Sequence, residues 1–245
     1  MSTAGPGDGA QVSDGAHISS SAGRRLRVAI LISGRGSNMA AIAHACAEGR
    51  IAATVVQVIA DRSDAAGIAL AGSLGLTAQT ITTAQFPDRS AFEGALESAL
   101  ERHGAELIVL AGFMRVLSAR FVHRHAGRLL NIHPSLLPKY KGLHTHRRVL
   151  QAGEREHGVS VHFVTAELDD GPVICQARLQ VGAPDSEHQL AARIQRLEHR
   201  IYPAVIGLIA AGRLQLAGAT VLLDGQPLPA PLLEDEHDAT PNAHA

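Results

Sequence analysis

Short apolar runs alternate along the chain with longer segments of mixed polarity. Residues 28–32 are apolar at every position, which is typical of a strand buried on both faces of a parallel sheet. Further short runs follow at 55–60, 77–81, 107–111 and 129–133, with helical segments between them. This alternation predicts right-handed β-α-β units, and therefore an α/β fold with an open, mostly parallel, twisted sheet and helices on both faces, a Rossmann-like arrangement.

The pattern changes in the second half of the chain. Residues 160–165 and 173–181 alternate in polarity or carry β-branched side chains, and Asp169–Gly171 supply turn chemistry between them. An antiparallel hairpin at the edge of the sheet is therefore predicted. A long helix with regularly spaced apolar residues follows from Glu187 to Ala211, and a last strand is predicted at 220–223.

The two ends of the chain lack this patterning. Residues 1–24 are rich in Gly, Ser, Ala and Asp and show no apolar periodicity. We therefore predict a disordered N-terminal extension at 1–24, one folded domain at 25–230 and a disordered C-terminal tail at 231–245. With 245 residues, the chain is long enough to bury a full core.

Composition limits the range of partners. The formal net charge is −1, with 22 basic and 23 acidic residues, so the chain has no electrostatic footprint for nucleic acid. No apolar run approaches the roughly 20 residues of a membrane span, and the N-terminus lacks the pattern of a secretory signal. The two cysteines, Cys46 and Cys175, are expected to be small buried side chains rather than a disulfide framework. We expect a cytoplasmic protein that binds small molecules, and a homodimer is compatible with the sequence.

A glycine-rich turn follows the first strand. Gly36, Ser37 and Asn38 lie between that strand and a helical run, where free backbone N–H groups and the positive end of the helix dipole attract an anion. The third glycine of a dinucleotide fingerprint is absent, because Ala40 and Ala41 stand at that point. The turn therefore favours a single phosphate, such as that of a sugar phosphate, with an ordinary strand-to-helix turn as the alternative.

Two polar side chains share one face at the end of the strand at 129–133. Asn131 and His133 project together because successive strand residues alternate faces. An amide and an imidazole placed this way can stabilise the oxygen of a carbonyl under attack. A carboxylate from the later turn, such as Asp169, could face His133 and favour its charged form. The alternative is a strand cap and an ordinary surface histidine.

The segment after the strand at 107–111 is unusually apolar for a loop. Met114, Arg115, Val116 and Leu117 follow the carboxyl end of that strand, where ligands bind in open α/β sheets. We interpret this segment as a wall of a hydrophobic slot, with core packing as the alternative.

Fourteen histidines raise the question of a metal site. His123 with His125, and His144 with His146, could each place two imidazoles on one side of an extended segment. Neither pair has companion Cys or carboxylate ligands at suitable spacing, and arginines lie beside both pairs. We therefore expect no metal.

Several motifs together resemble the folate-dependent formyltransferases, above all those that act on phosphoribosylglycinamide in purine biosynthesis. The motifs occur in family order at Asn131–Pro138, Gly142–His146, Gly158–Val164 and Leu168–Ile174. The resemblance extends from about residue 27 to about residue 229. It implies the formyltransferase fold and a one-carbon transferase that moves the formyl group of 10-formyltetrahydrofolate, a co-substrate, to the amine of phosphoribosylglycinamide.

The resemblance also implies roles for individual residues. Asn131 would hydrogen-bond the developing oxyanion, charged His133 would stabilise it, and Asp169 would hold His133 in its charged form. The substrate-binding residues would be Gly36, Ser37, Asn38, Gln195 and Glu198. The folate-binding residues would be Arg89, Met114, Arg115, Val116, Leu117, Asn131, Thr165, Ala166, Glu167, Leu168 and Asp169. Arg89 could instead be an exposed first-turn arginine, and the last helix could present Gln195 and Glu198 to solvent.

Three other functions are alternatives to this one. A 10-formyltetrahydrofolate hydrolase would be expected to carry an N-terminal regulatory domain longer than residues 1–24. A methionyl-tRNA formyltransferase would be expected to have a C-terminal nucleic-acid-binding domain and a basic surface. A non-catalytic folate or nucleotide sensor would not need Asn131, His133 and Asp169. Two positions depart from the commonest family pattern, Lys141 in place of proline and Ala166 in place of an acidic residue, and both bear on folate affinity.

Overall fold

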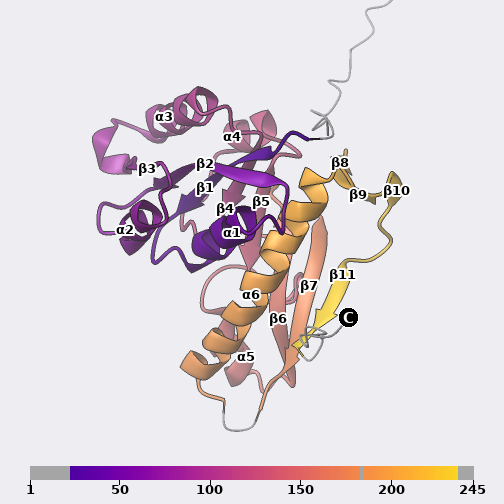
Figure 1. The fold of residues 1–245 in the computed structure, drawn as a ribbon. Coiled ribbons are helices and arrows are strands. Elements are labelled where there is room, and N and C mark those ends of the chain that lie inside the picture. Colours follow the sequence, from indigo (N-terminus) through magenta and orange to yellow (C-terminus); the bar gives the residue numbers. More distant parts are fainter. Residues whose placement is uncertain (1–22, 183–184, 237–245) are drawn as a thin grey trace, which may run out of the picture.

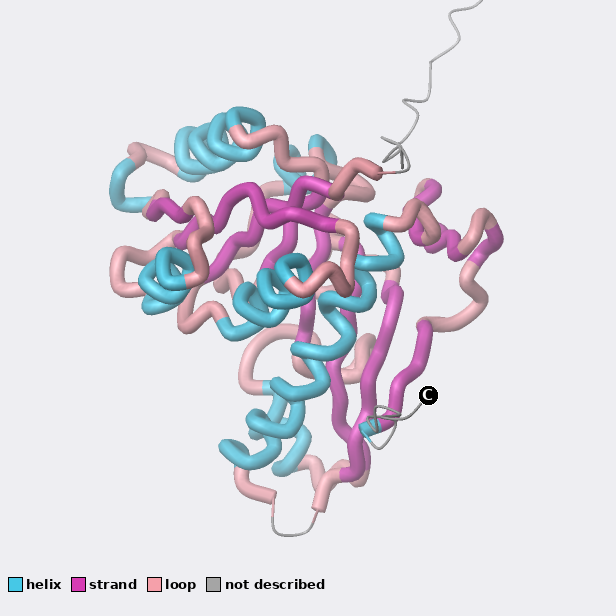
Figure 2. Tube along the Cα trace, in the orientation of Figure 1, coloured by secondary structure: helices cyan, strands magenta, loops and turns pink. Residues whose placement is uncertain are grey.

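The computed structural model describes residues 23–182 and 185–236. Its main sheet has the strand order β11-β7-β6-β5-β4-β1-β2-β3, and Figures 1 and 2 show helices packed around it. The strands of this sheet are β1 (Leu26–Ile32), β2 (Ala53–Ala60), β3 (Ala78–Thr80), β4 (Leu107–Leu110), β5 (Leu129–His133), β6 (Glu156–Phe163), β7 (Val173–Gln180) and β11 (Leu232–Asp235). The helices are α1 (Ser37–Ala47), α2 (Ala66–Ser73), η1 (Thr83–Gln85), α3 (Arg89–Arg102), α4 (Ala119–Arg124), α5 (Thr145–Gln151) and α6 (Glu187–Ala210).

The predicted open, mostly parallel sheet is confirmed. Strands β1 to β5 pair in parallel with one another, and β6 runs antiparallel to both β5 and β7. The predicted hairpin is thus present, but it does not form the edge of the sheet, because β11 pairs in parallel with β7 beyond it. A separate antiparallel sheet comprises β8 (Leu214–Ala217), β9 (Thr220–Leu223) and β10 (Gln226–Pro227).

Helices cover both faces of the sheet, as the sequence predicts. Alternate residues of β1 point to opposite sides, so that Ile30 packs in one cluster with residues of α1, α2 and α6. Leu31 packs in a second cluster with residues of α3 and α4. In Figure 1, α6 runs diagonally across β6 and β7. Because parallel strands end at one edge, the loops after β1, β2, β4 and β5 meet there.

The structure corrects part of the C-terminal prediction. Leu232–Asp235 form β11 rather than a disordered tail. Arg178 pairs with Asp235, and Arg200 pairs with Glu234 at 2.8 Å. These long-range pairs and the bonds to β7 have no local signature, which is why the segment lacks a recognisable strand pattern. Residues 1–22 and 237–245 lie outside the described residues, as do the predictions that concern them.

His125 makes stability depend on pH. The ring is buried and packs against that of Phe121, tilted by 51° with centroids 4.5 Å apart, and neither ring nitrogen has a hydrogen-bond partner among the described residues. Burial, reinforced by the charge of Arg128, lowers the pKa of His125 from 6.5 to about 4. The unfolded chain therefore binds a proton more readily than the folded protein between these values, and stability falls as the pH drops from 6.5 towards 4.

We expect His125→Leu to remove this acid sensitivity. At pH 5, about 1.5 units below the ordinary pKa of histidine, keeping His125 neutral in the folded protein costs roughly 2 kcal/mol of unfolding free energy. The unfolding free energy of the variant minus that of the wild type should therefore be about 2 kcal/mol more positive at pH 5 than at pH 8. Urea unfolding at the two pH values measures it. His123→Leu, at an exposed position in the last turn of α4, two residues before His125, is the matched control. An equal difference between variant and wild type at both pH values would contradict this account.

Candidate active site

A pocket of about 560 Å³ opens at the carboxyl ends of β4 and β5. Four of the five large hydrophobic side chains that are exposed in the described part of the chain line it, namely Met114, Val116, Leu143 and Leu168. Exposed apolar side chains that face one another across a pocket favour a flat apolar ligand, because its binding would remove them from water.

Asn131, His133 and Asp169 all line this pocket. His133 Nδ1 lies 3.4 Å from Asp169 Oδ2, and both side chains are only 8% exposed. The other ring nitrogen, Nε2, donates a hydrogen bond to the backbone carbonyl of Tyr140 at 2.9 Å. Both nitrogens of His133 therefore face oxygen atoms of neighbouring residues.

Asp169 reaches His133 through a loop that folds back along β5. Phe163 at the end of β6 pairs with Leu130, whereas Asp169 meets His133, three residues further along β5. Asp169 adopts a left-handed backbone conformation with φ 49°, which aspartate tolerates better than most residues. Its Oδ2 also accepts a hydrogen bond from the amide of Gly142 at 2.9 Å. The carboxylate is thus fixed from two sides.

His162, for which the sequence pattern predicts no role, lies next to Asn131 on the neighbouring strand. Asn131 and His162 are paired across β5 and β6, and Asn131 Nδ2 lies 3.2 Å from His162 Nε2. His162 Nδ1 donates to the carbonyl of Phe163 at 2.9 Å, which leaves Nε2 as an acceptor for the amide of Asn131. Burial lowers the pKa of His162 and so favours this neutral form. Strand alternation alone could not reveal the contact, because it depends on register.

The glycine-rich turn and α6 form a second polar cluster. Gly36 precedes α1 with φ 76°, a conformation that favours glycine. Gln195 Nε2 donates to Ser37 Oγ at 2.9 Å, and Asn38 Nδ2 donates to Glu198 Oε2 at 2.8 Å. Burial raises the pKa of Glu198. The turn and α6, about 160 positions apart in the chain, therefore bring the five predicted substrate-binding residues together.

The two clusters are neighbours. Ser33, three residues before Gly36, accepts a hydrogen bond at its Oγ from the amide of Met114 at 2.8 Å. Within the described residues, the amide N–H groups of Arg115, Val116 and Leu117 have no hydrogen-bond partner. A wall with free main-chain donors can bind the polar edge of a ring whose faces contact the apolar side chains.

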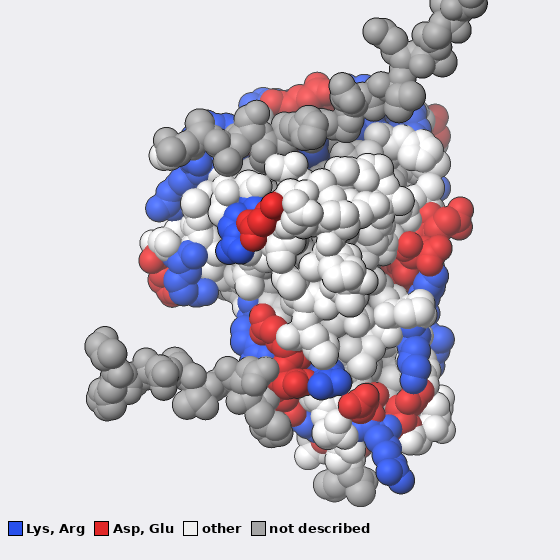
Figure 3. Space-filling model, turned by 90° about the vertical axis from the view of Figure 1, so that its right-hand side faces the viewer, with Lys and Arg blue, Asp and Glu red and all other residues white. Residues whose placement is uncertain are grey.

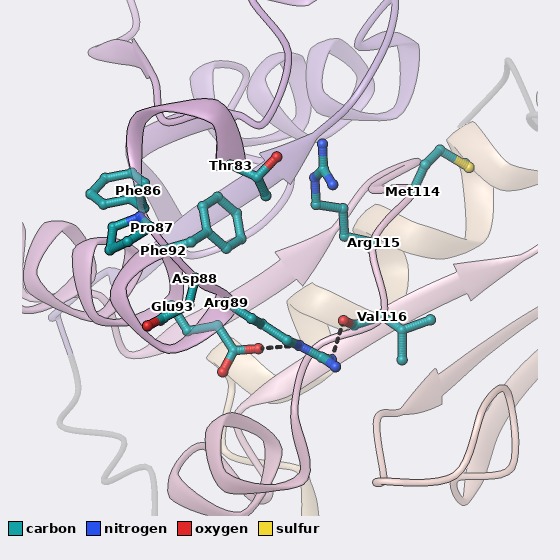
Figure 4. Close-up of a pocket in the computed structure, with 10 residues that line it drawn as sticks. All are labelled: Thr83, Phe86, Pro87, Asp88, Arg89, Phe92, Glu93, Met114, Arg115 and Val116. Carbon is teal, nitrogen blue, oxygen red and sulfur yellow. Dashed lines mark hydrogen bonds and ion pairs between the residues drawn. The ribbon is translucent and has the colours of Figure 1, made fainter.

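The predicted folate residues lie in two adjoining pockets. Leu117 and the Thr165–Asp169 loop line the first pocket, and Met114, Arg115 and Val116 separate it from a second one of about 540 Å³ (Figure 4). Arg89 lies in the second pocket, where its guanidinium donates to the carbonyl of Val116.

The described residues are expected to hold neither a metal site nor a membrane-spanning helix. In residues 23–182 and 185–236, no group of three or more His, Cys, Asp or Glu side chains could hold a metal ion. None of the helices in those ranges is long and apolar enough to cross a bilayer. On the face shown in Figure 3, basic and acidic side chains lie next to one another around a broad uncharged area. That face therefore offers no continuous basic surface to a polyanion.

Comparisons with known proteins agree with this geometry. A family model described as formyl transferase matches residues 26–206. The chain is 50% identical to phosphoribosylglycinamide formyltransferase of Escherichia coli over 204 residues, which cover 83% of this chain and 96% of that protein. A solved structure of phosphoribosylglycinamide formyltransferase from Coxiella burnetii in complex with CHES superposes with a TM-score of 0.83 at 47% identity, and the match covers 86% of this chain and all of that one.

A more distant structure shares the fold alone. A formyltetrahydrofolate deformylase from Pseudomonas syringae is 20% identical with a TM-score of 0.76, over 82% of this chain and 66% of that one.

The family model matches most of the described residues, and the formyltransferases of Escherichia coli and Coxiella burnetii are 50% and 47% identical to this chain. The sequence-based prediction of family and enzyme class is thus confirmed, and the chain belongs to the formyl transferase family.

Proposed function

We propose that the chain transfers the formyl group of 10-formyltetrahydrofolate to the amine of phosphoribosylglycinamide. The products are tetrahydrofolate and phosphoribosyl-N-formylglycinamide, an intermediate of de novo purine biosynthesis. The observation that carries this proposal is the meeting of Asn131, His133 and Asp169 in an apolar pocket beside a glycine-rich turn. The names of the relatives in Escherichia coli and Coxiella burnetii support the same reaction.

The folate donor fits the apolar pocket. Its pterin ring would lie between the Met114–Leu117 wall and the Thr165–Asp169 loop, where free amides can bind its polar edge. Arg89 in the adjoining pocket supplies a cation for the carboxylate end of the folate. The donor is consumed in each turnover and is therefore a substrate rather than a resident cofactor.

The phosphoribosyl substrate fits the second cluster. Its phosphate would bind the amide groups at the start of α1, beside Ser37 and Asn38. Gln195 and Glu198 lie within hydrogen-bonding distance of these two residues and would bind the polar groups of the sugar and the glycinamide. Since Ser33 contacts Met114, the two substrates would meet next to β5.

The reaction then needs one bond to form and one to break. The amine nitrogen bonds to the formyl carbon while negative charge develops on the formyl oxygen. Asn131 donates a hydrogen bond to that oxygen, and charged His133 stabilises it. The bond between the formyl carbon and the folate nitrogen then breaks, and the proton lost by the amine ends on that nitrogen. Asp169 holds His133 in its charged form and orders a water that carries this proton from the amine to the folate nitrogen.

The test is an incubation with both substrates, with tetrahydrofolate followed by absorbance and formylated glycinamide by mass spectrometry. We expect the two products in equal amounts and no tetrahydrofolate when phosphoribosylglycinamide is omitted. Rapid tetrahydrofolate release without the amine would instead show a hydrolase. Absence of both products, together with folate binding, would show a sensor.

We infer a cytoplasmic site of action for this chemistry. Cys46 and Cys175 are both free and buried, and burial raises the pKa of Cys175 to about 12. Two unpaired, unreactive thiols fit a reducing compartment.

A further inference from the structure

The Met114–Ser118 segment is a loop whose conformation is fixed by side chains from elsewhere in the chain. Met114 and Val116 are 67% and 61% exposed, whereas Leu117 packs in the core, so the apolar core anchors the segment at one residue only. Two buried carboxylates reach it from different elements. They are Asp61, which directly follows β2, and Glu93 in α3.

Asp61 holds the side chain of Arg115. Its carboxylate is 3% exposed, and Oδ2 lies 2.5 Å from Arg115 Nε. The guanidinium lies 6.0 Å from the centre of the Phe92 ring, which limits its freedom further. The other carboxylate oxygen, Oδ1, has no hydrogen-bond partner among the described residues. Arg115 is therefore the cation that compensates this buried charge.

Glu93 holds the other end of the segment. Its carboxylate is 1% exposed and accepts a hydrogen bond from the amide of Ser118 at 2.7 Å and another from the Ser118 hydroxyl. It also pairs with Arg89 Nε at 3.1 Å, and Arg89 in turn donates to the carbonyl of Val116 (Figure 4). Glu93 thus acts on the backbone at two points, directly and through Arg89.

We propose that Asp61 and Glu93 are positioning residues for the folate substrate. They hold the Met114–Leu117 wall so that its free amides keep one fixed geometry toward the pterin ring. This inference rests on the proposed function. Asp61 lines neither pocket and Glu93 lines only the second one, so each acts on the wall through other residues rather than by touching the reacting atoms.

The expected consequence is a selective loss of folate affinity. Main-chain amides that are already ordered bind a ligand without the entropic cost of ordering the loop. Removing one of the two carboxylates adds that cost to the binding of the folate. Because the contacts to the pterin ring do not change during the reaction, they affect ground state and transition state equally. Weakening them raises KM and leaves kcat unchanged.

The experiment compares Asp61→Asn and Glu93→Gln with the wild type. We expect each variant to raise KM for 10-formyltetrahydrofolate about tenfold or more, with kcat and the KM for phosphoribosylglycinamide within about twofold. Calorimetric titration with 10-formyltetrahydrofolate alone should show the same loss in Kd. The matched controls remove carboxylates from exposed ion pairs, as Asp64→Asn beside Arg62 and Glu101→Gln beside Arg124, and should leave all these values unchanged.

A double-mutant cycle tests the route of the effect. If Asp61 acts only through Arg115, then Asp61→Asn should add no further change in folate Kd to the Arg115→Met variant. Additive effects, or equal losses for both substrates, would overturn the proposal. Because the titration needs no turnover, unchanged folate Kd in both carboxylate variants refutes this inference, whereas absent formyl transfer by the wild type refutes only the proposed function.

Discussion

We expect Asn131→Ala, His133→Ala and Asp169→Ala each to lower kcat by about a hundredfold or more, since removal of one preorganised group at a developing oxyanion typically costs that much. The three side chains line one pocket, with His133 Nδ1 3.4 Å from Asp169 and Asn131 Nδ2 3.5 Å from the same carboxylate. The effect should fall on kcat, because the charge that these groups stabilise develops only during the reaction. Steady-state kinetics with both substrates measure it.

Two neighbouring variants provide matched controls. His123→Ala removes an exposed imidazole from α4, and Asp170→Ala removes the carboxylate next to Asp169, which pairs with Lys141 at the surface. Both should keep kcat within a few-fold of the wild type, and circular dichroism should show all variants folded. Near-normal turnover of the three active-site variants would refute the assignment of these roles.

Asp169→Asn separates charge from shape at the same position. The amide keeps the size of the side chain and can still accept from the amide of Gly142, but it no longer supplies a negative charge to His133. If Asp169 acts by holding His133 charged, this variant should lose nearly as much turnover as Asp169→Ala. Recovery to wild-type turnover would show that the position needs only a hydrogen-bond acceptor.

The parts of the site that follow from strand geometry were predictable from the sequence. Asn131 and His133 alternate with Ile132 in an apolar run, and a run of this kind after helical segments predicts the end of a parallel strand. The glycine-rich turn was recognisable for the same reason, since it joins an apolar strand to a helix start. Local periodicity thus located the Asn131 and His133 pair and the glycine-rich turn.

Contacts that depend on register or on long-range pairing could not be predicted in this way. His162 meets Asn131 only because β6 pairs with β5 in one particular register. Asp61 follows β2 as an ordinary polar residue, and only the fold places it beside Arg115. The strand at Leu232–Asp235 likewise forms because the edge of β7 was available to it. These features arise from packing between distant segments, which no local pattern records.

Gly171→Ala should both destabilise the protein and impair catalysis. A Cβ atom at this position would lie 1.8 Å from the backbone oxygen of Phe163 and 3.3 Å from the Thr165 side chain. Backbone cannot yield as a flexible side chain does, so the turn that follows Asp169 must move. Overpacking of this kind costs about 1–3 kcal/mol or more, which corresponds to a fall in Tm of roughly 2–12 °C for a domain of this size.

The catalytic loss should accompany the loss of stability, because the displaced turn carries Asp169, whose carboxylate lies 3.4 Å from His133. We expect kcat to fall about tenfold or more even where the variant is fully folded, since small misplacements of a catalytic group are costly. Gly94→Ala is the matched control: a Cβ there meets no atom within 4 Å, and alanine in α3 should raise stability by about 0.5–1 kcal/mol. Thermal melting gives the Tm of both variants, and steady-state kinetics give their kcat. A Gly171→Ala variant with unchanged Tm and kcat would show that the turn accommodates a side chain without moving Asp169.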